Sequence, residues 1–148
     1  MTDLERARRV FQTTTYATEV TGCVIDAVGD GWAVCSLALE PKHRNSLGVP
    51  MGGAVFTLAD FAFGVASNFD RDVFVSSGAD VHFLAPSRGK TLRAEARQLH
   101  GGRRTCVFRV TVTDDQGEQV AYLTIRGVRI RERTGRKSRK NLQGKNWD

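Results

Sequence analysis

Residues 52–68 read GGAVFTLADFAFGVASN, an almost wholly apolar segment that contains a single acid, Asp60. In a helix built from this segment, apolar side chains fall on nearly every side, which is typical of a helix enclosed by other structure. Burying an unpaired carboxylate is costly. The segment therefore predicts a central buried helix, and its one acid is the first candidate for a functional group.

The small and polar residues of this helix are not scattered. They recur at steps of three, four and three, and so share one narrow stripe of the helix surface: Thr57, Asp60, Gly64 and Ser67. Such a stripe can line a slot for a thin ligand, with the carboxylate part-way along it. Gly52 and Gly53 open the helix, where bare backbone amides at the positive end of the helix dipole can approach a ligand oxygen.

The length and composition fit one globular domain. A chain of 148 residues is about one domain long. No apolar run reaches the roughly 18 residues of a membrane span, because Asp60 interrupts the longest. The first residues are charged and lack an apolar secretory core. We therefore expect a cytoplasmic protein with no membrane partner.

The net charge of +6 is concentrated at the end of the chain. From Arg131 onward there are seven Lys or Arg residues and only two acids. We expect residues 131–148 to be a basic, disordered tail, and the alternative is a tail that attracts phosphate-bearing ligands. No aromatic interleaving or nucleic-acid motif accompanies these charges, so we expect no nucleic-acid partner.

The cysteines and histidines do not form a metal-binding pattern. The cysteines are an odd set on apolar segments, which predicts free buried thiols: Cys23, Cys35 and Cys106. His43 is expected to be exposed in its loop, and His82 and His100 to be structural or solvated. We expect neither a metal nor a cofactor.

The rest of the chain has mainly strand signals. Residues 2–12 have the pattern of a short amphipathic helix. The predicted strands are residues 23–28, 32–39, 75–84, 91–99, 105–112 and 120–130. A hairpin turn is expected at residues 29–31, and short connections among the last four strands predict an antiparallel meander. One sheet curled around the central helix satisfies this order, giving an α+β fold with a single domain over residues 1–130.

A longer segment around the helix start resembles a family signature. Residues 43–60 read HRNSLGVPMGGAVFTLAD. In hotdog-fold acyl-CoA thioesterases of the phenylacetate-degradation type, an Asn, a Gly, a His-Gly-Gly and a Leu-Ala-Asp fall at this spacing. Residues 75–77 (VSS), 83–86 (FLAP) and 102–104 (GRR) also fit. The resemblance covers residues 10–130 and implies a hotdog fold, in which an antiparallel sheet wraps one long helix, and hydrolysis of an acyl-CoA.

The resemblance implies a role for each matching position. Asp60 is similar to the family's catalytic carboxylate, and Gly52 to the backbone donor to the thioester carbonyl. Asn45 is similar to the amide that orients water or the carboxylate, and Ser76 to a hydroxyl that holds the attacking water. Met51 departs from the family, which usually has His before Gly-Gly.

Other residues are expected to contact the substrate. They lie at the helix start, along the stripe and in a basic turn suited to the phosphates of coenzyme A: Met51, Gly53, Thr57, Gly64, Ser67, Arg103 and Arg104. We expect the width of the acyl slot to be set by Phe56, Phe61 and Phe63 together with the strand faces.

Helix geometry predicts a composite site. Asp60 lies eight residues after Gly52, so the two are roughly 12 Å apart on one helix at about 1.5 Å per residue. Reacting groups must lie within about 3–3.5 Å of each other. Two antiparallel copies can meet this condition where one cannot. We therefore expect a homodimer with two composite sites, assembled as a dimer of dimers in a homotetramer.

Other interpretations remain open. Asp60 can activate water or attack the carbonyl directly, or it can be a structural acid bonded to the backbone or to Thr57. An acyl-thioester hydratase or dehydratase on the same scaffold needs a His near the acid, and no His lies in the helix or directly before it. A non-catalytic module that binds acyl-CoA is the other alternative.

Overall fold

The computed structural model describes residues 1–134. Two α-helices, two short helices of other types and six strands make up this part of the chain. In chain order they are α1 (Asp3–Phe11), the π-helix η1 (Tyr16–Thr21), β1 (Val24–Gly29), β2 (Trp32–Ala38), the 3-10 helix η2 (Pro41–His43), α2 (Gly52–Asn68), β3 (Val73–Phe83), β4 (Thr91–Gly101), β5 (Thr105–Asp114) and β6 (Gln119–Arg131).

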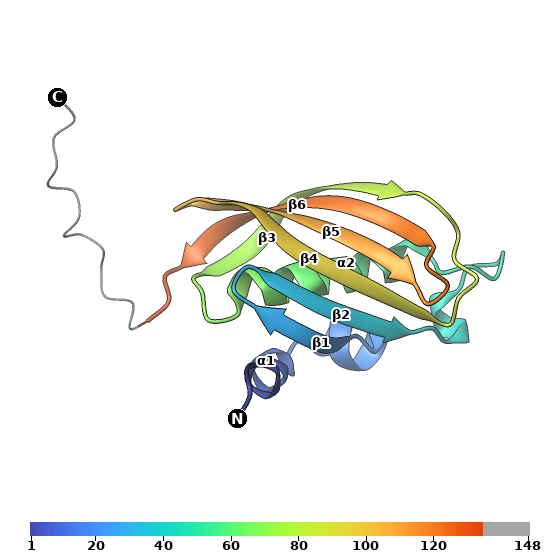
Figure 1. Ribbon diagram of the computed structural model, residues 1–148, viewed down its shortest axis with the longest axis horizontal. Coiled ribbons are helices and arrows are strands. Elements are labelled where there is room, and N and C mark those ends of the chain that lie inside the picture. The colour runs from blue at the N-terminus through green and yellow to red at the C-terminus, as the bar shows by residue number, and fades with distance from the viewer. Residues whose placement is uncertain (135–148) are drawn as a thin grey trace, which may run out of the picture.

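A single antiparallel sheet curls around α2, as the sequence predicts (Figure 1). Alternate residues of the central strands face the helix and are fully buried: Leu92, Ala94 and Ala96 of β4, and Phe108, Val110 and Val112 of β5. Phe63 of α2 meets Phe108 edge to face, with ring centroids 5.5 Å apart. The core therefore lies between one helix and the concave face of one sheet, which confirms the predicted α+β fold.

The predicted meander is wrong for one strand. The strand order is β1-β2-β4-β5-β6-β3, so β3 pairs with β6 at the edge of the sheet and not with β4. Residues 84–90 cross the end of the sheet: the Leu84 amide donates to the Val120 carbonyl (2.9 Å), and the Leu39 amide donates to the Lys90 carbonyl (2.8 Å). A short linker indicates a hairpin only in a flat sheet, and this sheet curls enough for a short linker to skip two strands.

Both ends of the described part of the chain, residues 1–134, pack onto this core. Thr2 and Glu5 form a capping box at the start of α1, and Arg8 donates from Nε to the Ile25 carbonyl of β1 (2.9 Å). At the other end β6 runs to Arg131, and the Arg133 amide donates to the Asp72 carboxylate (2.9 Å). Residues 135–148, most of the predicted basic tail, lie outside the described residues.

The sequence also makes predictions about the cysteines, membrane spans and metal ligands. Cys23, Cys35 and Cys106 are free and buried, as predicted, and burial raises the pKa of each thiol, to about 12 for Cys23. Within residues 1–134, no helix is long and apolar enough to cross a membrane. The same part of the chain holds no cluster of three or more side chains suited to a metal ion.

Candidate active site

The stripe on α2 lies on the face that the sheet leaves uncovered. Apart from its chain neighbours and the helix's own backbone, a Cβ added at Gly53 or Gly64 would meet no atom within 4 Å, and Thr57 and Asp60 are half-buried. Ser67 is buried in the last turn of α2, and its hydroxyl donates to the Gly64 carbonyl (3.4 Å), so its contact with substrate remains a prediction. An open face three turns long, with Asp60 in its middle, remains.

Asp60 and Ser76 come together from different elements, α2 and the edge strand β3. Partial burial raises the pKa of the Asp60 carboxyl above its ordinary value, and a hydrogen bond with the Ser76 side chain opposes part of that rise. The Thr57 hydroxyl donates to the Gly53 carbonyl (2.9 Å) and is thereby committed to the helix backbone. A desolvated carboxylate beside a hydroxyl, on an open helix face, is suited to general base or nucleophilic chemistry.

The loop before α2 is built by Asn45. Its side-chain oxygen accepts hydrogen bonds from the backbone amides of Leu47 (2.9 Å) and Val49 (3.4 Å). The backbone N–H of Asn45 in turn donates to the Val49 carbonyl (2.9 Å). This is the turn-forming arrangement that is common for asparagine. Asn45 thus shapes the segment that leads to Gly52, and its predicted contact with water or a carboxylate remains a prediction.

The prediction for His43 is wrong, since this residue is buried and fully bonded. Its Nδ1 accepts from the Glu40 amide (2.9 Å) and its Nε2 donates to the Thr21 carbonyl (2.7 Å). The His43 carbonyl accepts from the amide of Met51, the N-cap of α2 (2.7 Å). This hydrogen bond fixes where α2 starts. The sequence gives no signal of it, because His43 lies in a loop with no periodic pattern around it.

A groove adjoins the helix start. It has a volume of about 350 Å³ and lies between Gly52 and the segment that follows β3. The ring of Phe83 would lie 3.0 Å from a Cβ at Gly52, so this glycine allows Phe83 to pack against the backbone. Sequence reasoning missed this groove. Phe61 and Phe63 are 5% and 2% exposed and belong to the core, and their effect on the width of the acyl slot remains a prediction.

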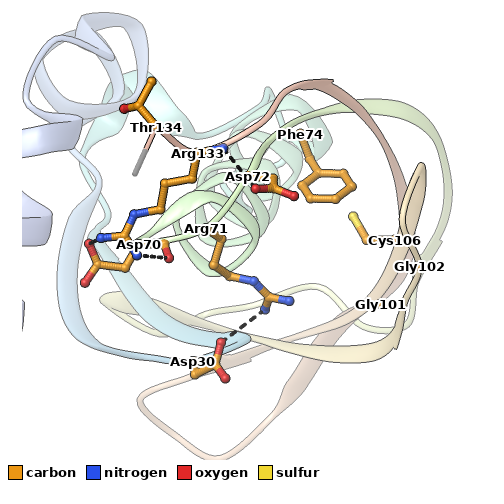
Figure 2. A pocket seen from close by; sticks show the side chains of 10 residues that line it. All are labelled: Asp30, Asp70, Arg71, Asp72, Phe74, Gly101, Gly102, Cys106, Arg133 and Thr134. Atoms are coloured by element: carbon orange, nitrogen blue, oxygen red, sulfur yellow. Dashed lines mark hydrogen bonds and ion pairs between the residues drawn. The ribbon is translucent and has the colours of Figure 1, made fainter. Parts of the chain in front are cut away.

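A second cavity lies elsewhere, beyond the carboxyl end of α2 (Figure 2). It has a volume of about 520 Å³, and its charged side chains are paired across it. Arg71 donates to Gln98 (2.6 Å) and lies 3.7 Å from Asp30, and Arg133 bonds to Asp70. The cavity is lined by neither Asp60 nor Gly52, and it is not the candidate active site.

The remaining predicted residues do not converge on Asp60 within one chain. Arg103 and Arg104 are exposed in the turn between β4 and β5, next to Gly101 and Gly102, which line the cavity of Figure 2. Gly52 and Asp60 sit on the same helix, eight residues apart. Met51 is 59% exposed at the rim of the helix start. Within one chain, Gly52 and Asp60 therefore lie on different turns of α2.

A long helix wrapped by one antiparallel sheet, with an acid on its open face and glycines at its start, is the hotdog arrangement. Residues 47–121 match the thioesterase superfamily, and the chain belongs to this family. It is 32% identical over 110 residues to the acyl-coenzyme A thioesterase PaaI of Escherichia coli, covering 74% of this chain and 79% of PaaI.

Solved structures agree with this assignment. The E. coli PaaI protein from the phenylacetic acid degradation operon superposes with a TM-score of 0.81 at 26% identity, covering 88% of this chain and 95% of that one. The smu.793 protein of Streptococcus mutans, bound to acetyl CoA, gives a TM-score of 0.70 at 27% identity, covering 74% and 89% of the two chains. The hotdog fold and the predicted family are thereby confirmed.

Proposed function

We propose that this protein hydrolyses acyl-CoA thioesters with Asp60 as the catalytic carboxylate. The observation that carries the proposal is the half-buried Asp60 carboxylate, with a raised pKa and a Ser76 partner, on the open face of α2. Its relatives support the choice of substrate, since the E. coli relative is an acyl-coenzyme A thioesterase and the S. mutans relative binds acetyl CoA.

The reaction needs few groups. Asp60 removes a proton from water as the water oxygen adds to the thioester carbonyl carbon. The amide of Gly52, at the positive end of α2, donates to the oxyanion that forms. The carbon–sulfur bond then breaks, the carboxylic acid is released, and the sulfur takes the proton from Asp60 to leave as the free thiol of coenzyme A. In the alternative route the Asp60 carboxylate adds to the carbonyl carbon, and the carbon–sulfur bond breaks to release the coenzyme A thiolate and leave a mixed anhydride. Water then hydrolyses the anhydride to the carboxylic acid and the Asp60 carboxylate, and the proton that is released neutralises the thiolate.

The proposal includes a homodimer. A carbonyl bound at Gly52 of one copy must meet Asp60 of another, because the two groups are too far apart on one helix. β3 is an exposed edge strand that carries Ser76, and edge strands offer unpaired backbone groups for pairing with another chain. Antiparallel pairing of two β3 edges would bring two open helix faces together. Assembly into a dimer of dimers is part of the same proposal.

Coenzyme A would lie with its phosphates at the surface. Arg103 and Arg104 are our candidates for them, since both are exposed and adjacent in one turn. Guanidinium groups bind phosphate well in such positions.

The test is thiol release from a panel of acyl-CoAs by the wild type and by Asp60→Asn. We expect turnover by the wild type and a loss on the order of 10² to 10⁴ in rate for the variant. Near-normal turnover by Asp60→Asn would remove Asp60 from the chemistry. A wild type that binds acyl-CoA and releases no thiol would show a binding module instead.

A further inference from the structure

The groove beside Gly52 has an apolar interior. Phe83 at the end of β3, with Leu84 and Pro86 after it, forms one wall of the groove, and Val120 of β6 also lines it. Phe83 is 58% exposed and Leu84 is 54% exposed, so both side chains present large apolar surfaces at the groove. Its lining, all within the described residues, includes no charged side chain.

The single hydroxyl in the lining is already committed. The Ser87 hydroxyl donates to the Asp114 carboxylate (2.6 Å) and accepts from the Gly89 amide (3.1 Å). Asp114 also accepts from the amides of Gln116 and Glu118, both at 2.9 Å. The side chains of the groove therefore offer no spare hydrogen-bond partner to a polar ligand.

The wall of the groove is held in place from both sides. The Leu84 amide donates to the Val120 carbonyl (2.9 Å), and the Lys90 amide donates to the Asp115 carboxylate (2.8 Å). Arg44, in the loop before α2, donates to the Gly89 carbonyl (3.2 Å). The groove is a fixed feature of the fold, formed where the helix start and the crossing segment 84–90 are tied together.

Position and chemistry together define its occupant. If the thioester oxygen accepts from the Gly52 amide, as the proposed function requires, the groove begins at the reacting carbonyl carbon. Two chains leave that carbon. The pantetheine chain has two amide groups, and burying them without partners is costly. An apolar acyl chain has no such cost and gains from burial.

We propose that this groove binds the acyl group of the substrate, that it selects apolar acyl chains, and that Phe83 sets its width next to the carbonyl. The inference rests on the proposed function for its orientation at Gly52. Burial of each further methylene should raise kcat/KM roughly fourfold until the groove is filled. An acyl chain that ends in a carboxylate should be rejected, because nothing in the lining pairs with it.

The experiment compares Leu84→Asp with Leu99→Asp. Leu99 is the matched control, since it is also 54% exposed but lies on β4, outside the groove. We would measure kcat/KM for acetyl-, butyryl-, hexanoyl- and succinyl-CoA. We expect Leu84→Asp to lower the hexanoyl-to-acetyl ratio about tenfold, which is what burying a charge beside the chain should cost at minimum. Leu99→Asp should leave the ratio unchanged, and Phe83→Ala should favour branched acyl chains.

Two readouts separate this proposal from the proposed function. The same ratio is measured as binding affinity in the Asp60→Asn background, with and without Leu84→Asp, so it does not depend on turnover. If the wild type is active and Leu84→Asp leaves the hexanoyl-to-acetyl ratio unchanged, only the proposal that the groove binds the acyl chain would be overturned. If the wild type shows no turnover but Leu84→Asp still lowers the hexanoyl-to-acetyl ratio of binding affinities, the groove would be supported and hydrolysis overturned.

Discussion

Asp60 is a carboxylate that the fold keeps partly out of water. Burial raises its pKa in the folded protein above that of the unfolded chain. The folded state therefore holds the proton more tightly, so stability falls as pH rises from the ordinary Asp range through the raised pKa. Above the raised pKa the protein carries the full cost of this ionised group. A residue that costs stability and lies on an open surface is better explained by chemistry than by structure.

Replacing this carboxylate should stabilise the protein while inactivating it. We expect Asp60→Asn to unfold at a higher temperature than the wild type at pH 7, because the amide has no charge to desolvate. The difference should shrink as pH falls below the ordinary pKa of Asp, where the carboxyl is protonated in both states. Thermal unfolding at several pH values measures it. A variant less stable than the wild type at pH 7 would favour a structural role for Asp60.

The Ser76 hydroxyl should tune the pH dependence of the reaction. The base must be deprotonated, so kcat/KM should fall as pH falls through the raised pKa of Asp60. The hydrogen bond with Ser76 lowers that pKa. We therefore expect Ser76→Ala to move the acidic limb of the pH–rate profile to higher pH. Ser77→Ala is the control, since the Ser77 hydroxyl donates to the Arg126 carbonyl (3.3 Å). Coincident profiles for both variants and the wild type would contradict this coupling.

Among the helices and strands, periodicity in the sequence predicted the features that depend only on neighbouring residues. The central helix begins and ends where the apolar segment does, and β5 shows the alternation that was expected for residues 105–112. The partner of β3 was not predictable in this way, because it depends on the curl of the whole sheet. The resemblance, not periodicity, paired Asp60 with Ser76. The groove was missed because its wall is an irregular segment whose position depends on Ser87 and Asp114.

The start of α2 depends on His43, and its replacement should act on catalysis through Gly52. Removing a buried group with two partners commonly costs about 1–3 kcal/mol. We expect His43→Ala to lower stability by that amount and to lower kcat more than it raises KM, since the proposed oxyanion donor, the Gly52 amide, would be misplaced. His82→Ala is the control, because His82 is exposed and stacks on Tyr122.

Hydrogen exchange at the Met51 amide reports the same change without turnover, since that amide donates to the His43 carbonyl. Faster exchange together with a lower kcat is the expected result. An unchanged kcat in a destabilised His43→Ala protein would limit His43 to holding the fold together.

For the whole molecule, the proposed site is divided between the start of α2, at Gly52, and its middle, at Asp60. The sheet covers most of this helix but leaves the face with Asp60 open, next to the edge strand β3. Val75 and Phe83 of that strand are exposed apolar side chains. An unpaired, partly apolar edge is a common site of association. A second copy placed there would cover the open helix face and bring its own Gly52 toward Asp60.

Subunit mixing tests this division directly. Gly52→Pro removes the donor N–H, and it suits the first position of a helix. The preceding residue, Met51, already has the extended conformation that a following proline requires (φ −64°, ψ 139°). Alone, this variant should lose about 10² to 10³ in kcat, as expected for one oxyanion donor, and Asp60→Asn should be inactive as well. In a mixed population half of the dimers combine the two variants, and each of these has one intact site. Co-refolded protein should therefore regain about a quarter of wild-type activity. No recovery in mixed dimers, with their formation confirmed by mass spectrometry, would mean that Gly52 and Asp60 do not act across the interface.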